Sequence, residues 1–191
     1  MGLVQNSYKP STWATRRSVN GGASWTTVDS FPTTRGSSSQ GTAVDSKGNV
    51  TVVGFGLNSA SEGLLWTVRQ SRDKGVTWAT IDSTAGRAFG VTTVPRADGT
   101  ALPDDIYVSG DVTTTFSMYW VVRKLTASLS AQGSITWSAT VVDSSQPVSA
   151  QTVTACGGPI YVPASATLCV TGTAVDSAAT HHWITRSALL Q

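Results

Sequence analysis

The sequence repeats itself, and this repetition limits the folds open to the chain more than any other feature. Four segments read Trp-x-x-Arg: WATR from Trp13, WTVR from Trp66, WVVR from Trp120 and WITR from Trp183. Successive copies begin 53, 54 and 63 residues apart. Self-similarity on this scale is typical of solenoids and propellers. We therefore predict that residues 1–191 form a single domain of repeats with a period of about 53–63 residues.

Each unit contains further strand-like segments. A second tryptophan follows three of the four copies, and each leads to an aspartate: Trp25 to Asp29, Trp78 to Asp82 and Trp137 to Asp143. A third segment ends in glycine, as NVTVVG, DIYVSG or TLCVTG, 10 to 12 residues before the next Trp-x-x-Arg. A further short strand precedes it, GTAVD in the clearest unit and AQTVTAC in the last. Four short strands joined by tight turns are typical of a propeller blade.

Composition supports an all-β fold. Serine, threonine and glycine are abundant, and 40% apolar with 13% charged residues is typical of a globular chain. The predicted fold class is all-β, with four-stranded antiparallel propeller blades and about three blades in the chain. The net charge of +2 is spread along the sequence, so we expect no nucleic-acid partner. No apolar run approaches the roughly 20 residues of a membrane span.

One turn is written twice, as SRDKGVTW from Ser71 and SVNGGASW from Ser18. The pattern Ser-x-Asp-x-Gly-x-Thr-Trp resembles the Asp-box, or BNR, repeat of sialidase-like β-propellers. The third copy, SAQGSITW, has lost its acid. We expect these residues to hold the hairpins together, because short side chains accept turn N–H groups and glycine adopts conformations closed to other residues. The tryptophan is expected to pack into the blade. The motif residues are Ser18, Asn20, Gly22, Trp25, Ser71, Asp73, Gly75, Trp78, Gly133 and Trp137.

The number of blades raises the question of closure. The segments run as strands three and four of one blade, two complete blades, and strands one to three of another. Closed propellers have about four to eight blades, and unpaired sheet edges favour association. We therefore predict a homodimer whose two chains close a six-bladed ring. The alternative is that the chain is a piece of a longer propeller.

The resemblance also carries expectations about activity. Sialidases use an arginine cluster, a tyrosine nucleophile activated by a glutamate, and an acidic proton donor. This sequence has one glutamate, Glu62, and lacks an Arg-Ile-Pro signature near its N-terminus. We therefore predict a non-catalytic binding or scaffold module, with carbohydrate or another protein as its ligand, and assign no catalytic residue. The alternative is a sialidase-like glycoside hydrolase that is active only in the assembled ring.

Candidate ligand-binding residues come from the repeat and from outside it. Arg16, Arg69, Arg123 and Arg186 occupy one repeat position, where they either bind ligand or pair across strands with Asp29, Asp82 and Asp143. Phe55 and Tyr119, like Phe89 and Phe116, lie outside the strict repeat and are the aromatic candidates. All seven tryptophans fall at repeat positions, and Tyr107 and Tyr161 lie in similar IYV segments and are expected to pack in blades.

Metal, cofactor and redox expectations are limited. The histidines, His181 and His182, are adjacent and would point to opposite faces of a strand, so we predict no metal site. Asp98, Asp104, Asp105 and Asp111 could offer oxygens to calcium, but a solvated loop is favoured. Cys156 and Cys169 are either a disulfide or two buried thiols. No cofactor motif is present, and no signal-peptide pattern opens the chain. An extracellular or periplasmic location is favoured, with the compartment left open.

Overall fold

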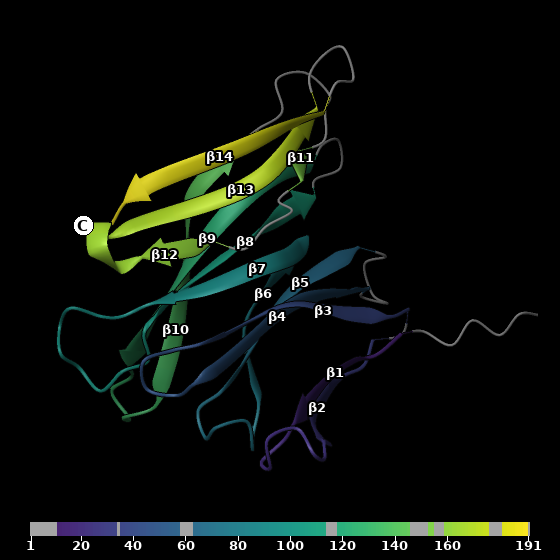
Figure 1. Cartoon of the computed structure of the whole chain (residues 1–191), viewed down its shortest axis with the longest axis vertical. Helices are drawn as coiled ribbons and strands as arrows, with labels where there is room; N and C mark the ends of the chain where they lie inside the picture. Colours follow the sequence, from purple (N-terminus) through teal and green to yellow (C-terminus); the bar gives the residue numbers. More distant parts are fainter. Residues whose placement is uncertain are drawn as a thin grey trace, which may run out of the picture.

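The computed structural model describes residues 11–33, 35–57, 63–113, 118–145, 153–154, 159–175 and 181–190. Its strands form antiparallel sheets that follow one another along the molecule (Figure 1). This confirms the predicted all-β class. The described part contains no helix that is long and apolar enough to cross a membrane.

The sheets are called the first to fourth blade, in chain order. The first contains β1 (Trp13–Arg17) and β2 (Thr26–Phe31). The second contains β3 (Ser37–Val44), β4 (Val50–Leu57), β5 (Leu64–Ser71) and β6 (Ala79–Ala85). The third contains β7 (Arg87–Val94), β8 (Asp105–Thr113), β9 (Met118–Leu129) and β10 (Ile135–Ser145). The fourth contains β11 (Val153–Thr154), β12 (Ile160–Val162), β13 (Thr167–Val175) and β14 (His181–Leu189), with a 3-10 turn at Pro163–Ser165.

Within the second and third blades, neighbouring strands pair in chain order. The Trp-x-x-Arg segments form the third strand of each blade, and the glycine-ending segments form the second strand. The fourth blade differs, because β11 and β12 both pair with β13, at residues 173–174 and 167–169. Tyr161 therefore lies in a first-strand position, whereas Tyr107 lies in the second strand β8. The two similar IYV segments therefore occupy different strands of their blades.

The core lies between adjacent blades. Trp66 and Val68 of β5 are fully buried against the third blade, in a cluster that includes Ala88, Ile106, Val108 and Leu125. A second cluster joins Tyr107, Trp120 and Val122 of the third blade to Leu168 and Val170 of the fourth. Alternation along β5 places its apolar side chains on this face and turns Arg69 toward the first blade. Each sheet is thus stabilised mainly by the blade beside it.

A glycine inside the second strand of the second and third blades allows the chain to pack closely around it. A Cβ atom at Gly110 would overlap both the carbonyl oxygen of Arg87 and the Trp66 ring of the preceding blade. A Cβ atom at Gly54 would overlap the carbonyl oxygen of Ser38. These positions therefore require glycine for space rather than for a turn conformation, which accounts for their recurrence ahead of each Trp-x-x-Arg segment.

A β-bulge recurs in the strand that follows the Trp-x-x-Arg strand of the first three blades, namely β2, β6 and β10. One residue is left unpaired immediately before the repeated aspartate: Val28 before Asp29, Ile81 before Asp82 and Val142 before Asp143. A bulge changes the face to which the following side chain points. It therefore governs where these three carboxylates go.

Candidate functional site

The second Asp-box is a closed network of hydrogen bonds in the β5–β6 turn. The Asp73 Oδ1 atom accepts the backbone N–H of Val76 at 3.0 Å and that of Thr77 at 2.8 Å, and its Oδ2 accepts the Thr77 hydroxyl at 2.6 Å. Ser71 Oγ accepts the Gly75 N–H at 2.7 Å and donates to Asp73 Oδ1 at 2.8 Å. The hydroxyl and N–H of Thr77, followed by Ser71, hold the pKa of Asp73 well below its usual range.

The other two copies keep parts of this network. In the β1–β2 turn, Asn20 Oδ1 accepts the Ser24 N–H at 2.9 Å, and Ser18 Oγ accepts the Gly22 N–H at 2.8 Å. In the β9–β10 turn, Gly133 donates its N–H to the Ser130 carbonyl at 2.9 Å. The motif glycines all have positive φ, at 90° for Gly22, 85° for Gly75 and 76° for Gly133. The glycine geometry thus persists where the acid has been lost.

The tryptophans of the motif differ in burial. Trp78 and Trp137 are half-buried, whereas Trp25 is 53% exposed and its Nε1 donates to the Gly22 carbonyl at 3.0 Å. The expected packing of the tryptophan into its blade therefore does not hold for Trp25. Its ring folds back over its own turn, and much of its surface faces solvent.

The repeated arginines join adjacent blades. Arg69 of the second blade binds Asp29 of the first through two contacts of 2.6 Å, and its guanidinium also lies 5.5 Å from the centre of the Phe31 ring. Arg123 of the third blade binds Asp82 of the second at 3.0 and 2.9 Å. These parallel contacts have the bidentate geometry that favours arginine over lysine. They engage the guanidinium of both candidate ligand-binding residues.

The two remaining arginines are more exposed. Arg186 of the fourth blade binds Asp143 of the third at 3.0 Å, with 43% of the arginine side chain exposed. Arg16 of the first blade is exposed and donates to the backbone carbonyl of Trp25 at 3.0 Å. Of the four repeat arginines, Arg16 is therefore the one whose described hydrogen bond is to a neutral acceptor.

A second cluster lies where β7 begins and β8 ends. The Arg87 Nε donates to Asp111 Oδ2 at 3.0 Å, and the Asp111 side chain is fully buried. The Arg87 guanidinium lies 5.1 Å from the centre of the Phe89 ring, which meets the Phe55 ring edge to face at 6.1 Å. Tyr119, which is half-buried in β9, is not among these ring contacts.

β-Bulges shape the first strands beside this cluster. The pairing register shifts between Ser39 and Gly41 in β3, and between Ala88 and Gly90 in β7. The residues left out of the ladder are Gln40 and Phe89. Bulges are frequent next to binding sites, because they re-aim one side chain without breaking the sheet. Here a bulge redirects the Gln40 amide in β3, and an equivalent bulge redirects the Phe89 ring in β7.

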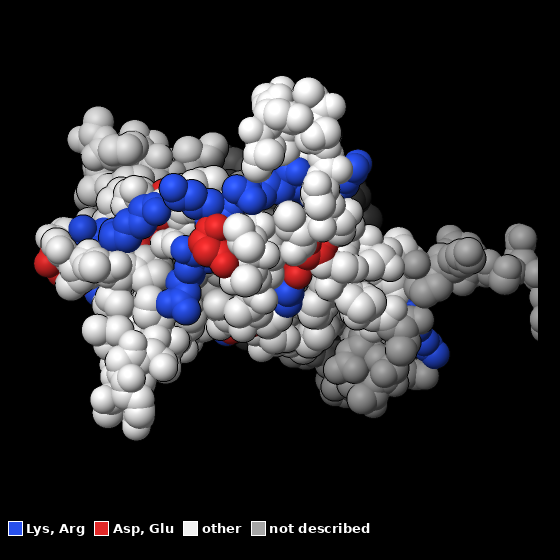
Figure 2. Space-filling model, turned by 90° about the horizontal axis from the view of Figure 1, so that it is seen from below, with Lys and Arg blue, Asp and Glu red and all other residues white. Residues whose placement is uncertain are grey.

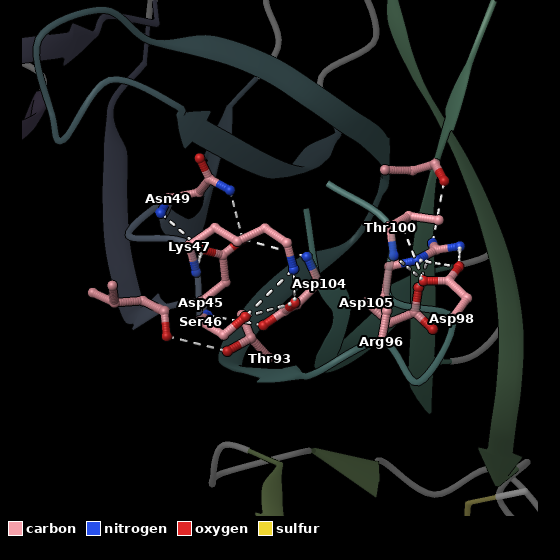
Figure 3. A network of polar contacts seen from close by, with 12 residues as sticks. Asp45, Ser46, Lys47, Asn49, Thr93, Arg96, Asp98, Thr100, Asp104 and Asp105 are labelled. Carbon is pink, nitrogen blue, oxygen red and sulfur yellow. Dashed lines mark hydrogen bonds and ion pairs between the residues drawn. The ribbon is translucent and has the colours of Figure 1, made fainter. Parts of the chain in front are cut away.

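The loops that lead into β4 and β8 carry a polar network (Figure 3). Asp104 is fully buried, and it accepts the Ser46 N–H at 2.8 Å and the Lys47 ammonium at 2.8 Å. Burial opposes its ionisation, but Lys47 and Ser46 outweigh this effect and hold the pKa of Asp104 below its usual range. Asp45 accepts two hydrogen bonds from Asn49, at 2.8 and 2.6 Å. The network therefore ties the second blade to the third.

Arg96 organises the second half of this network. It binds Asp98 at 2.6 Å and Asp105 at 3.3 Å, and Asp105 also binds Lys124 at 2.8 Å. Arg96, followed by the N–H and hydroxyl of Thr100, holds the pKa of Asp98 well below its usual range. The expectation of a solvated acidic loop is wrong for Asp104 and Asp111, because both side chains are fully buried. Within the described ranges, no group of three or more His, Cys, Asp or Glu residues could hold a metal ion.

Every carboxylate in the described structure takes part in an ion pair or in the hydrogen bonds of a turn. The sequence has eleven acidic residues, and Glu62 and Asp176 lie outside the described residues. Each of the other nine makes an ion pair or accepts turn hydrogen bonds. Asp29, Asp82, Asp98, Asp111 and Asp143 bind arginines, Asp104 and Asp105 bind lysines, and Asp45 and Asp73 bind turn N–H groups.

Other predicted residues fall partly outside the described part. Cys156 lies outside it, and Cys169 in β13 is half-buried, so the disulfide stays a prediction. Phe116 also lies outside the described residues. His181 and His182 are in β14, where only their backbone pairing with β13 is described.

Comparison with known proteins bears on the fold. No family model matches the chain, and no curated protein matches it. A solved structure of a mutant of the α-L-arabinofuranosidase Arb93A from Fusarium graminearum, in complex with an iminosugar inhibitor, matches 79% of this chain and 45% of that chain, with a TM-score of 0.50 and 15% identity. The four-stranded antiparallel sheets of this chain are consistent with the propeller blades of that structure. A second structure of Arb93A with an iminosugar inhibitor matches 78% of this chain and 44% of its own, with a TM-score of 0.51 and 14% identity.

The chain thus spans less than half the length of the solved chains that it matches. At 14 and 15% identity the likeness concerns the fold and does not extend to the activity. It agrees with the β-propeller fold that the Asp-box turns indicate.

Sequence reasoning missed several residues that the structure brings together. Arg87 and Asp111 gave no motif, because they are separated by 24 residues and meet only when β7 pairs with β8. The turn DSKGN that begins at Asp45 was a usable signal, since an aspartate before Gly and Asn often caps its own turn. Its partner Asp104, 58 residues from Ser46, could not be found in this way.

Proposed function

We propose that this protein is a non-catalytic carbohydrate-binding module of the sialidase-like propeller type. One observation carries the proposal: all nine described aspartates are engaged in ion pairs or turn hydrogen bonds. Most glycoside hydrolases use two carboxyl groups, one protonating the leaving group and one acting as nucleophile or base, and sialidases still need an acidic proton donor and a glutamate that activates their tyrosine. Aspartates that neutralise arginines or fasten turns are poorly suited to either role.

The proposed ligand surface is the Arg87, Phe89 and Phe55 cluster. Aromatic rings provide apolar faces for the C–H surface of a sugar, and a guanidinium supplies several donors for its hydroxyl groups. The Asp111 carboxylate keeps the Arg87 side chain oriented while about a quarter of it stays exposed. Such an arrangement of one fixed donor group beside two rings suits binding without turnover.

A glycan array probed with the full chain and with Phe89→Leu tests the proposal. Leucine retains an apolar side chain but removes the ring face, so we expect the variant to lose its signal for neutral glycans while its circular dichroism is unchanged. Phe31→Leu, which alters a ring of the first blade, is the matched control and should keep the signal. Equal binding by the wild type and Phe89→Leu would contradict this assignment.

The alternative function is glycoside hydrolysis, and the structural likeness to an arabinofuranosidase favours testing it. A panel of fluorogenic sialosides and arabinofuranosides should give no turnover with this chain. If turnover is seen and Glu62→Gln abolishes it, the non-catalytic proposal fails.

Homodimerisation is a second part of the proposal. The Trp-x-x-Arg strands of the two complete blades, β5 and β9, pair with a neighbour on both sides. Their counterparts in the terminal blades, β1 and β14, each pair on one side only among the described strands. Unpaired edges favour association. Light scattering on a size-exclusion column should therefore give twice the mass of one chain, and a monomer at micromolar concentration would contradict the closed six-bladed ring.

A further inference from the structure

A groove lies between the first and second blades, away from the Arg87 cluster. Its volume is about 390 Å³, within the range of small-molecule pockets. The first blade contributes Arg16, Arg17 and Trp25 to its lining, and the second contributes Lys74 and Trp78. The groove is therefore bordered by the first two Asp-box turns, for which the sequence predicted only a structural role in their hairpins.

The charge of the groove is positive. Three cationic side chains line it, and its described lining residues include no aspartate or glutamate. Neither Arg16, Arg17 nor Lys74 makes an ion pair with a described residue. The two nearest acids in sequence are already bound, Asp29 by Arg69 and Asp73 by its own turn. Figure 2 shows that Lys and Arg side chains form a broken band across one face of the molecule.

The groove holds these cations beside aromatic surface. A Cβ atom at Gly75 would lie 3.4 Å from Cδ of Arg17 and 3.9 Å from Cζ2 of Trp78, so both side chains border the same turn. More than half of Trp25 is exposed. The Trp78 Nε1 is buried and has no hydrogen-bond partner among the described residues. The same is true of the fully buried core tryptophans Trp66 and Trp120, so it is the exposed Trp25 ring beside the cations that indicates a ligand.

We infer that this groove binds an anionic oligosaccharide, one whose sugars carry carboxylate or sulfate groups. Indole faces stack on the apolar face of a sugar ring, and guanidinium groups form charge-assisted hydrogen bonds to carboxylate or sulfate oxygens. Neither component alone defines the ligand, because a neutral sugar leaves the three cations unpaired and a simple anion leaves the indole exposed. The combination of both selects a charged sugar.

This site is separate from the one proposed above. It uses side chains of the first blade and of the β5–β6 turn, whereas the Arg87 cluster lies at the β7–β8 pair. A variant at one site is therefore expected to leave the other unchanged, and either proposal can fail alone.

The test is isothermal titration of the full chain with trigalacturonate, with a sulfated disaccharide of the heparin type, and with neutral maltotriose. We expect at least one charged sugar to bind, with an affinity that falls as sodium chloride rises, and maltotriose to bind at least tenfold more weakly. The carboxylate and sulfate arms identify which anion the groove accepts. A lack of binding by both charged sugars, or equal binding of maltotriose, would overturn the inference.

Variants locate the binding. Trp25→Ala and Arg17→Ala should each weaken it by tenfold or more, and Lys74→Gly should also weaken it without straining the turn, since Lys74 has a φ of 60°. Arg72→Ala is the matched control, because Arg72 is an exposed cation of the same hairpin that does not line the groove. An equal loss in Arg72→Ala, or equal binding of a short DNA duplex, would show non-specific attraction of polyanions and contradict the site.

Discussion

The ion pairs between blades should differ in strength according to their burial. The Arg69–Asp29 pair is largely buried, with 13% of the arginine side chain and 7% of the aspartate side chain exposed. The Arg186–Asp143 pair joins equivalent positions of the third and fourth blades but is 43% and 28% exposed. The chain thus contains two versions of one contact in different environments.

We expect Arg69→Met to lower the free energy of unfolding by about 3 kcal/mol. Removing one partner of a buried pair costs about 3–5 kcal/mol, because the other charge is left without compensation. The low end applies here, since Asp29 keeps some access to water. Exposed pairs contribute about 0.2–1 kcal/mol, so Arg186→Met should cost less than about 1 kcal/mol.

Urea unfolding followed by tryptophan fluorescence measures both changes. The double variant Arg69→Met with Asp29→Asn should be more stable than the sum of the single losses predicts, because no unpaired charge remains. Added salt should weaken the Arg186 contact more than the Arg69 contact. If the two arginine variants lose the same stability within about 0.5 kcal/mol, burial does not decide the strength of these pairs and the reasoning is refuted.

Three further predictions concern the turns and the close packing of the blades. The folded-state pKa of Asp73 lies below the usual aspartate value of about 4, so its stabilisation is complete above that pH and is lost as the pH falls toward the folded-state pKa. Asp73→Asn should therefore flatten the acid side of the stability profile, and Asn20→Asp should steepen it, as measured by thermal melts from pH 2 to 7. Lys74→Gly should raise the unfolding free energy by about 0.5 kcal/mol, because relief of the left-handed backbone, about 1–2 kcal/mol, exceeds the entropic cost of glycine; a destabilised variant would contradict this. Gly110→Ala should lower the free energy of unfolding by about 3 kcal/mol or prevent folding. Gly99→Ala, where a Cβ atom meets no neighbour, should lower it by about 1 kcal/mol through backbone strain. Equal losses in the two variants would show that space at Gly110 is not limiting.

Much of the fold was accessible from the sequence because its signals are local. A hairpin turn is specified by residues that touch one another within eight positions, so the Asp-box at Ser71 could be recognised without a structure. The alternation of Trp66 and Val68 with Arg69 likewise follows from strand geometry. The fourth blade was predicted less well, because its first strand is divided between β11 and β12 and the sequence pattern did not reveal this division.

The candidate sites were less accessible, because they are made by contacts between blades. The sequence suggested that Arg69 and Asp29 could pair, but it did not reveal that the pair joins two blades or that the bulge at Val28 precedes it. Arg87 and Asp111 carried no pattern at all. The groove between the first two turns could not be predicted, because Trp25 and Trp78 occupy the same repeat position and the sequence does not show which of them stays exposed.

The sequence by itself determined the repeat, the order of strands within a blade and the turns that connect them, because these depend on neighbours along the chain. Only the tertiary structure decided which charges meet, which carboxylates are occupied and where cations stand beside exposed indole rings. Those features depend on the distance and angle between one sheet and the next. Identical repeat positions therefore acquire different roles: Arg69 is engaged by Asp29, and Arg16 lines an open groove.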